Sequence, residues 1–464
     1  MIRGNRLFVS RLEKSLGIEV YATRSPGIGG VIRRLPEDFL VKEILVNGSS
    51  AEIFPSKREP IGKDALPLQR HLLCILVKRN WDNLQAVKAI TQKLGISMRQ
   101  VGIAGLKDAK ALTAQHITIE GVSIEDIRKV KIKDLNIYPV GYFNVKLSPH
   151  FLLGNSFKIT IRRLSLSKTN TLERILKTIT ELQALGGVPN FFGHQRFGTI
   201  RPITHLVGKA LVKGDVRKAV MLFLAKSSPI EHPESRKARE ELWKTQDFKK
   251  ALEIFPKNLR YERLILRHLI NKPRDFIGAL KRLPIKLQRL FPQAYQAYLF
   301  NKILSRRIAR GLPINKAEVG DYVVEVEPSG LPNTLRYRVV NQETISEVNK
   351  AIECGKMLLA IPLAGFKQKI SYGIQGEIEK AVLDEEGVSP EDFKIKGLPK
   401  LSLRGDLRAA LSCIKDLSVH EISRDEINAG KNKVVMSFML YRGSYATIVL
   451  REFMKPRNLI KAGF

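Results

Sequence analysis

A loop-like stretch with one aspartate offers the strongest candidate for chemistry in this chain. In VGIAGLKDAKALTAQHITI, residues 101–119, small residues and Gly105 lead into Lys107-Asp108, and a strand-like run follows. A loop between ordered elements is where a reactive carboxylate is best presented, as a nucleophile or as a base. Taken alone, an aspartate beside Lys107 and Lys110 is more often a turn residue with a solvated charge. The neighbouring motifs must therefore decide.

A second stretch carries the residue types that an unstacked nucleic-acid base requires. VPNFFGHQRFGTI, residues 188–200, combines Asn190 and Arg196 with phenylalanines and glycines. Aromatic faces stack on bases, amides read base edges and glycines allow close approach. Core packing is a fair alternative for Phe191 and Phe197 individually. It explains the whole run less well, because Asn, His, Gln and Arg are poor core formers.

The charge balance points to a polyanionic partner. Lysine and arginine number 79 against 45 acidic residues in 464, which gives a formal net charge of +34. A lysine-rich thermophile surface or a membrane-surface protein would be an alternative, but thermophile ion-pair networks enrich both signs together. Nucleic acid is therefore the first partner to consider.

Several classes of protein find little support. The three cysteines, Cys74, Cys354 and Cys413, are too far apart for a CxxC motif and too few for a disulfide framework. The eight histidines stand singly, so we expect no metal site. The absence of GxGxxG disfavours a methyltransferase or other dinucleotide-type enzyme. The charged start of the chain does not resemble a signal peptide, and no run reaches membrane-spanning length, which predicts a cytoplasmic protein without membrane segments.

The sequence around residues 101–119 and 188–200 predicts a mixed α/β fold. Residues 71–78 resemble a buried strand, and a helix should follow from an Asp82 or Asn83 cap to Gly95, with Leu84, Val87, Ile90 and Leu94 on one face. Alternating apolar residues predict strands at 157–161 and 434–440, and a helix should cover 172–182. Residues 200–310 are helical and basic, and strand-like pieces follow. This shift predicts one domain inserted into another.

Five motifs together resemble the TruD family of pseudouridine synthases, which includes the eukaryotic Pus7 proteins. The resemblance spans nearly the full chain, and the second and third motifs are highly specific. In chain order they are PEDFxVxE at 36–43, AGLKDxxALTxQ at 104–115, NFFGxQRFG at 190–198, AYQxYLFN at 294–301 and GSYATxVLRE at 443–452.

The resemblance implies a role for particular residues. The catalytic carboxylate falls on Asp108, and its basic partner on Arg33, with Arg34 as the neighbouring alternative. Substrate contacts fall on a set that carries aromatic or amide side chains: Phe39, Asn190, Phe192 and Tyr445. We also expect RNA contacts from Lys107, Gln195, Arg196 and basic residues of the helical region, although a solvated helix face is an equal alternative for the last group: Arg282, Lys286, Arg289, Arg306 and Arg307.

The resemblance further implies the architecture. It implies a pseudouridine synthase catalytic domain with a mixed, largely antiparallel sheet flanked by helices, and an inserted domain. Composition and motif positions place the boundaries near 200 and 402, so the catalytic domain should comprise residues 1–200 with 402–464. An inserted α/β TRUD domain should comprise residues 201–401.

The implied reaction isomerises a uridine of a structured RNA, with tRNA as the expected partner of a monomeric enzyme. The bond from C1′ to N1 is broken and a bond from C1′ to C5 is made, so no cofactor is expected. Asp108 could attack the sugar or base covalently, or deprotonate the ribose, and both routes need it ionised. A non-catalytic RNA-binding or chaperone protein is the main rival function.

Overall fold

The computed structural model describes residues 8–55 and 71–464, which form two compact units. The helix-rich unit comprises 8–22, Pro189–Glu327 and Pro332–Leu411. The large-sheet unit comprises Pro328–Leu331, Ser412–Phe464 and the described part of Thr23–Val188. The chain thus crosses between units near 189 and 411, and residues 8–22 go with the helix-rich unit. The very start of the chain, part of the signal-peptide expectation, lies outside the described residues.

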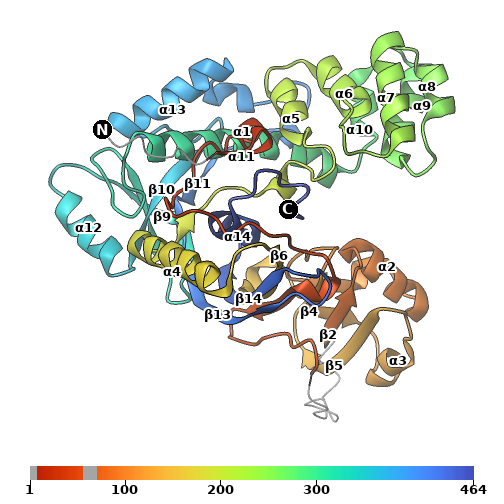
Figure 1. The fold of residues 1–464 in the computed structure, drawn as a ribbon. Coiled ribbons are helices and arrows are strands. Elements are labelled where there is room, and N and C mark those ends of the chain that lie inside the picture. Colours follow the sequence, from red (N-terminus) through yellow and green to blue (C-terminus); the bar gives the residue numbers. More distant parts are fainter. Residues whose placement is uncertain (1–7, 56–70) are drawn as a thin grey trace. The chain divides into compact units, whose positions relative to one another are not determined.

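One mixed sheet dominates the large-sheet unit (Figure 1). Its strands are β1 (Phe39–Leu45), β2 (His71–Arg79), β3 (Val101–Ile103), β4 (Leu112–Glu120), β5 (Leu135–Phe143), β6 (Leu152–Leu164), β13 (Ile414–Arg424) and β14 (Asn432–Tyr441). They lie in the order β13-β14-β6-β1-β4-β2-β5, and β3 pairs with β4. β1 and β4 are parallel, and the other described pairs are antiparallel. The expected mixed, largely antiparallel sheet is confirmed.

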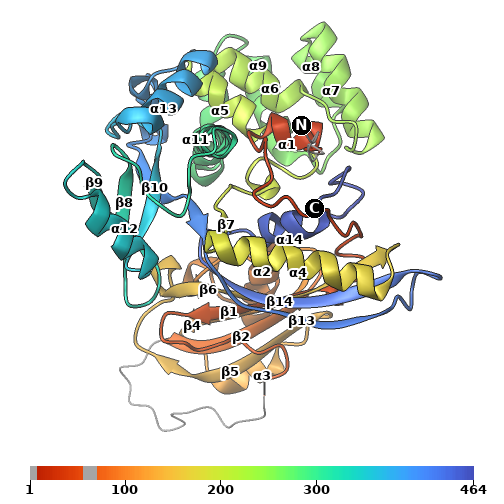
Figure 2. The same cartoon turned by 60° about the vertical axis from the view of Figure 1, so that its left-hand side comes forward.

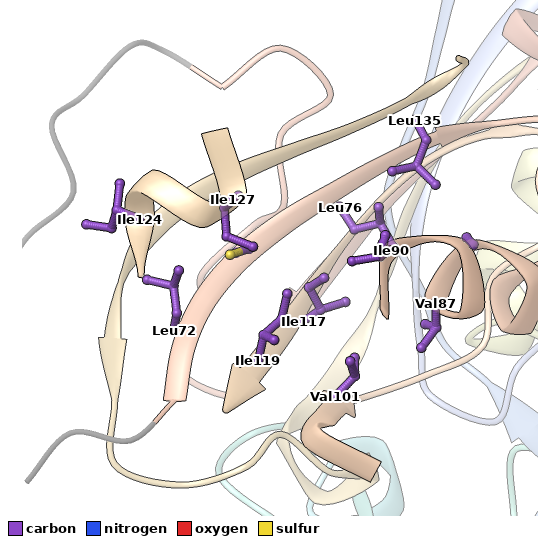
Figure 3. Packing of buried hydrophobic residues seen from close by; sticks show 12 residues of the cluster. Leu72, Leu76, Val87, Ile90, Val101, Ile117, Ile119, Ile124, Ile127 and Leu135 are labelled. Atoms are coloured by element: carbon purple, nitrogen blue, oxygen red, sulfur yellow. The ribbon is translucent and has the colours of Figure 1, made fainter. Parts of the chain in front are cut away.

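Four helices cover this sheet: α2 (Asn83–Leu94), α3 (Ile124–Lys129), α4 (Lys168–Leu185) and α14 (Ala446–Met454). α2 and α3 pack their apolar residues against β2, β4 and β5, as Figure 3 shows for Val87 and Ile90 of α2 and Ile127 of α3. α4 contacts both α14 and β13, and Figure 2 shows α4 and α14 together over the β13–β14 end of the sheet. The sheet is therefore held rigid by helices along its length, which suits it to position reactive groups.

The parallel pairing in the middle of the sheet brings two sequence motifs together. Val41 of β1 lies beside Thr113 of β4, and Lys78 of β2 lies opposite Thr113 on the other side. β1 belongs to the PEDFxVxE motif, and β4 follows the GLKD loop. Hydrogen bonding between these strands thus fixes the GLKD loop next to the PEDF segment.

The helix-rich unit combines a small antiparallel sheet with many helices (Figure 1). Its helices are α1 (Arg11–Ser15), α5 (Thr204–Val212), α6 (Val216–Ala225), α7 (Pro233–Thr245), α8 (Phe248–Ile254), α9 (Arg260–Asn271), α10 (Phe276–Lys281), α11 (Ile285–Ala309), α12 (Ile345–Glu353) and α13 (Gly373–Glu386). Its strands are β8 (Tyr322–Val326), β9 (Pro332–Val339), β10 (Met357–Leu363) and β11 (Asp406–Ala409), in the order β11-β10-β8-β9. Two short strands, β7 (Val188–Pro189) and β12 (Leu411–Ser412), mark chain crossings. The long helix α11 packs against α5, α13 and β10.

Local sequence signals correctly located the elements that they predicted near the motifs. Asp82 caps α2 by accepting from two backbone N–H groups, and Gly95 ends it with φ 68°. The strand predicted at 157–161 is the middle of β6, and the strand predicted at 434–440 lies within β14. One expectation was wrong: Leu84 is 59% exposed, because it lies in the first turn of α2, outside the apolar face that Val87 and Ile90 bury.

Candidate active site

Asp108 lies in the loop that joins β3 to β4, at the end of the GLKD motif. One carboxylate oxygen, Oδ1, is 3.0 Å from Nη2 of Arg33, and the Asp108 side chain is 32% exposed. The carboxylate is therefore neutralised by a cation on one side and open to a ligand on the other. Because Arg33 makes this pair and Arg34 is exposed, the geometry selects Arg33 of the two expected alternatives.

Arg33 is held in place from three directions. Its Nη1 donates to the carbonyl of Gly463 at 3.1 Å, and its guanidinium lies 4.1 Å from the centre of the Phe39 ring. Its backbone has φ 59°, a conformation that costs an L-residue roughly 1 kcal/mol. Burial lowers the pKa of Arg33, and the Asp108 carboxylate opposes that shift. An arginine remains protonated under such conditions, where a lysine would not reliably do so.

A buried ion pair anchors the GLKD loop, which carries Asp108, to β1. Lys107 Nζ is 2.6 Å from Glu43 Oε2, and Glu43 Oε1 accepts from the backbone N–H of His116 at 2.9 Å. Burial by itself would raise the pKa of Glu43, but His116 and Lys107 outweigh it and lower that pKa. The carbonyl of Gly105 accepts from two amide side chains of neighbouring elements. The loop that carries Asp108 is thus ordered before any ligand binds.

The burial of Lys107 corrects one expectation. Its side chain is 2% exposed and its ammonium faces Glu43, so in this structure it cannot reach an RNA phosphate. The ion pair crosses from the loop to β1, which the local sequence around Lys107 does not reveal. Glu43 itself ends the PEDFxVxE motif, but no role was expected for it.

Phe39 differs from a simple stacking platform, whereas Tyr445 stays partly exposed. Phe39 is 1% exposed and packs edge-on against Phe157, with ring centres 6.2 Å apart, so no face is open to a base in this structure. Its ring supports the Arg33 guanidinium instead. Tyr445 is half-buried at the N-terminal end of α14, and the preceding Ser444 bonds Ser412 through their hydroxyls at 2.7 Å.

In the helix-rich unit, Asn190 and Phe192 share one arginine that sequence reasoning missed. Arg408 of β11 donates to the Asn190 backbone oxygen at 3.0 Å and to Asn190 Oδ1 at 2.6 Å. Its guanidinium lies 4.0 Å from the centre of the Phe192 ring. Asn301 of α11 brackets Phe192 by bonding both its backbone N–H and its carbonyl. The AYQxYLFN motif, which ends at Asn301, therefore positions the NFFG segment.

The remaining expected RNA contacts differ in how far they are exposed. Gln195 and Arg196 are half-buried in a short 3₁₀ turn, and Arg196 donates to Gln293 at 3.3 Å. Arg306 is partly exposed and pairs with Glu385 at 2.5 Å. Arg282, Lys286 and Arg289 lie at exposed positions of the helix-rich unit.

Arg307 is a second correction. It is 0% exposed and makes two bonds to Asp321, from Nη1 at 2.8 Å and from Nη2 at 2.7 Å. It also donates to the Gln375 side chain. A guanidinium enclosed in this way anchors α11 to the start of β8 and cannot contact RNA in this structure. Arg306 and Arg307 are adjacent in sequence, so only the direction of the helix face separates an exposed cation from a buried one.

No group of three or more metal-ligating side chains occurs among the described residues. Within 8–55 and 71–464, no helix is both long enough and apolar enough to cross a membrane.

Comparison with known proteins identifies the family. The model of the family tRNA pseudouridine synthase D (TruD) matches residues 15–453. This chain belongs to the TruD family. The resemblance seen in the motifs is confirmed, and the family accounts for the mixed sheet flanked by helices.

Individual relatives match over almost their whole length. A protein of Methanosarcina mazei named "Probable tRNA pseudouridine synthase D" is 40% identical over 451 residues, which cover 97% of this chain and 99% of that protein. One of Methanopyrus kandleri with the same name is 43% identical over 387 residues, 83% of this chain and 85% of that protein. The crystal structure of a Methanosarcina mazei protein described as "Putative tRNA pseudouridine synthase D (TruD)" superposes with a TM-score of 0.81 at 39% identity, covering 96% of this chain and 98% of that one. The fold and the motifs of the TruD family thus extend through both units.

Proposed function

We propose that this protein converts a uridine of tRNA to pseudouridine, with Asp108 as the catalytic carboxylate. The observation that carries the proposal is the Asp108–Arg33 pair: a partly exposed carboxylate held at 3.0 Å by a buried guanidinium. Such an arrangement keeps a carboxylate ionised while leaving room for a ligand on its other side. Membership of the TruD family supplies the reaction class, since isomerisation of uridine is what its named members share.

The chemistry demands an ionised Asp108 on either route. The reaction breaks the C1′–N1 bond, turns the base, and joins C1′ to C5, while the proton on C5 is released and N1 gains one. Asp108 can add covalently and then leave, or it can take a proton from the ribose and return it after re-addition. Atoms and electrons balance within the nucleotide on both routes, so nothing is consumed.

Other residues are proposed to receive the RNA. A uridine in folded tRNA must leave its stack, which costs a few kcal/mol that new contacts in the site offset. We assign the uracil contacts to Asn190, Phe192 and Tyr445, and phosphate contacts to Gln195, Arg196 and Arg306. Exposed basic residues of the helix-rich unit would add sequence-independent attraction.

The proposal extends to the oligomeric state, cellular location and domain boundaries of the protein. We propose a monomer that acts in the cytoplasm without a cofactor, on tRNA as its main substrate. Its catalytic domain would comprise residues 1–200 with 402–464, and its inserted domain residues 201–401. The crossings near 189 and 411 support an insertion of about this extent.

The test is direct mapping of the product. Purified protein is incubated, without cofactors, with total tRNA that lacks pseudouridine, and pseudouridine is mapped by carbodiimide-stop sequencing beside Asp108→Ala. Stops at defined uridines with the wild-type protein alone are expected. Tight tRNA binding without new stops would overturn the proposal and favour the RNA-chaperone alternative.

A further inference from the structure

Lys78, at the end of β2, is a buried lysine directly beneath the Asp108 loop. Lys78 is 0% exposed, and its Nζ donates at 2.7 Å to the carbonyl of Asp108 and at 2.7 Å to the carbonyl of Trp81. Lysine is almost never fully buried unless it is paired, because desolvating its ammonium is costly. No acidic side chain within 8–55 and 71–464 makes an ion pair with Lys78, so the two carbonyls are its direct partners in the described structure.

The surroundings of Lys78 explain how an ammonium persists there. The charged groups acting on it come from two elements: Asp108 and Lys107 of the GLKD loop, and Asp82 at the start of α2. Across the strands Lys78 faces Thr113 of β4 and Leu135 of β5, which carry no charge. Of the two carboxylates, Asp108 raises the pKa of Lys78 more than Asp82 does.

We propose that Lys78 is a positioning residue for catalysis: it holds the Asp108 peptide in place and adds a second positive charge near the Asp108 carboxylate. The inference rests on the proposed function of Asp108. It differs from the role of Arg33, which touches the carboxylate itself. Lys78 acts on Asp108 from the backbone side, so it fixes where the carboxylate points.

The charge state of Lys78 gives the inference a pH signature. Burial lowers the pKa of Lys78 to about 8; Asp108 and Asp82 oppose that shift, and Lys107 adds to it. The ammonium is thus lost as the pH rises through about 8. Because this pKa is depressed in the folded protein, deprotonation of Lys78 makes folding more favourable between about pH 8 and the ordinary lysine range. Activity should fall over a range in which this group does not destabilise the fold.

The decisive experiment compares three variants with wild type in single-turnover pseudouridine formation on one defined tRNA. In Lys78→Met we expect the maximal rate to fall about 100-fold, the size of effect that a small displacement of a reactive group produces. The tRNA concentration for half-maximal rate should change less than about twofold, because affinity comes from phosphate contacts. Lys78→Arg keeps a charge that does not titrate in this range. The pH at which the rate begins to fall should therefore be higher in this variant than in wild type.

Lys455→Met is the matched control. Lys455 is another lysine of the large-sheet unit whose pKa is lowered by burial, and its Nζ bonds the Thr23 hydroxyl and the Glu452 carbonyl. Its loss should change the thermal midpoint as the loss of Lys78 does, with an unchanged pH–rate profile. Circular dichroism and thermal unfolding of every variant separate loss of fold from loss of rate.

Each outcome decides the inference. Full activity of Lys78→Met with a wild-type pH profile would overturn it, as would a wild-type rate that stays level through about pH 8. If Lys78→Met does not fold, the pH–rate profiles of Lys78→Arg and wild type still decide, because a purely structural lysine would leave both alkaline limbs alike. A wild-type protein that forms no pseudouridine on any tRNA would instead refute the proposed function itself.

Discussion

In each unit of this molecule, an arginine contacts a phenylalanine ring and bonds a side-chain oxygen, but the residue that it bonds differs in character. In the large-sheet unit, Arg33 lies 4.1 Å from the ring centre of Phe39 and bonds Asp108 Oδ1. In the helix-rich unit, Arg408 lies 4.0 Å from the ring centre of Phe192 and bonds Asn190 Oδ1. Each guanidinium therefore packs against a phenylalanine ring and donates a hydrogen bond to the side-chain oxygen of a residue that is expected to contact the substrate.

The difference lies in what the arginine holds. Asp108 is an acid with one oxygen facing Arg33, so this pair joins two opposite charges as well as fixing a position. Asn190 is neutral, and its backbone N–H and side-chain Nδ2 are also bonded, to the carbonyls of Ala410 and Ala409. With both of its oxygens on Arg408, Asn190 is fixed in one orientation. We infer that the first pair places a cation against the reactive carboxylate and that the second sets orientation.

The largest effect should come from Asp108. Asp108→Asn keeps the shape of the side chain and its contact with Arg33 but removes the ionised oxygen. We expect a rate loss of about 10³-fold or more, because both chemical routes need the carboxylate. Filter binding of tRNA should be unchanged. Rapid turnover by this variant would show that another group performs the chemistry.

Removal of Arg33 should come next. Arg33→Met should slow the reaction about 100-fold, because Asp108 loses the guanidinium that holds its carboxylate in position. Arg33→Lys should recover part of the rate, because an ammonium restores the positive charge beside Asp108. Single-turnover rates of the two variants measure this, and a wild-type rate for Arg33→Met would mean that the reaction does not need the pair.

The orientation-setting arginine should give a smaller effect of another kind. Arg408→Met should lower the single-turnover rate about tenfold, with the pH–rate profile unshifted, because no titrating group has lost a partner. Arg408→Lys should not rescue it, since one ammonium cannot replace a guanidinium that bonds two oxygens and covers a ring. Rescue by lysine at position 408 would remove the distinction between the two pairs.

The smallest effect should come from an arginine outside both pairs. Arg306→Ala should leave the maximal rate unchanged and weaken tRNA binding about twofold, with a lower dependence of affinity on salt by about one unit of slope. Salt titration of tRNA affinity measures this. Arg307→Ala is the matched comparison: it should leave the salt dependence alone and destabilise the fold by about 3–5 kcal/mol, because Asp321 is left buried without its cation.

Local patterns were sufficient for the few elements that the sequence analysis located. Alternating apolar residues gave β6 and β14, and the Asp82 cap with Gly95 gave the ends of α2, because these signals depend on residues within one turn or one strand. The motif around Asp108 likewise indicated the family, which the comparisons confirm. The assignment of Asp108 as the catalytic group stays a prediction.

The errors share one physical cause. Lys107 and Arg307 were expected at RNA, yet each is buried against a carboxylate from another element, Glu43 of β1 and Asp321 beside β8. Phe39 was expected to stack on a base, yet Arg33 and Phe157 cover it. The sequence alone does not show whether a cation or an aromatic ring faces water or a partner residue from another element.

The sequence by itself determined the mixed α/β class, the strands and helices around the motifs, the basic charge and the candidate carboxylate. These depend on composition and on short-range periodicity. Only the tertiary structure decided which cations serve Asp108: Arg33 reaches it across 75 positions, and Lys78 bonds its carbonyl from 30 positions away. Such pairs form only when strands far apart in the chain lie side by side, and the free energy of burying them depends on that packing.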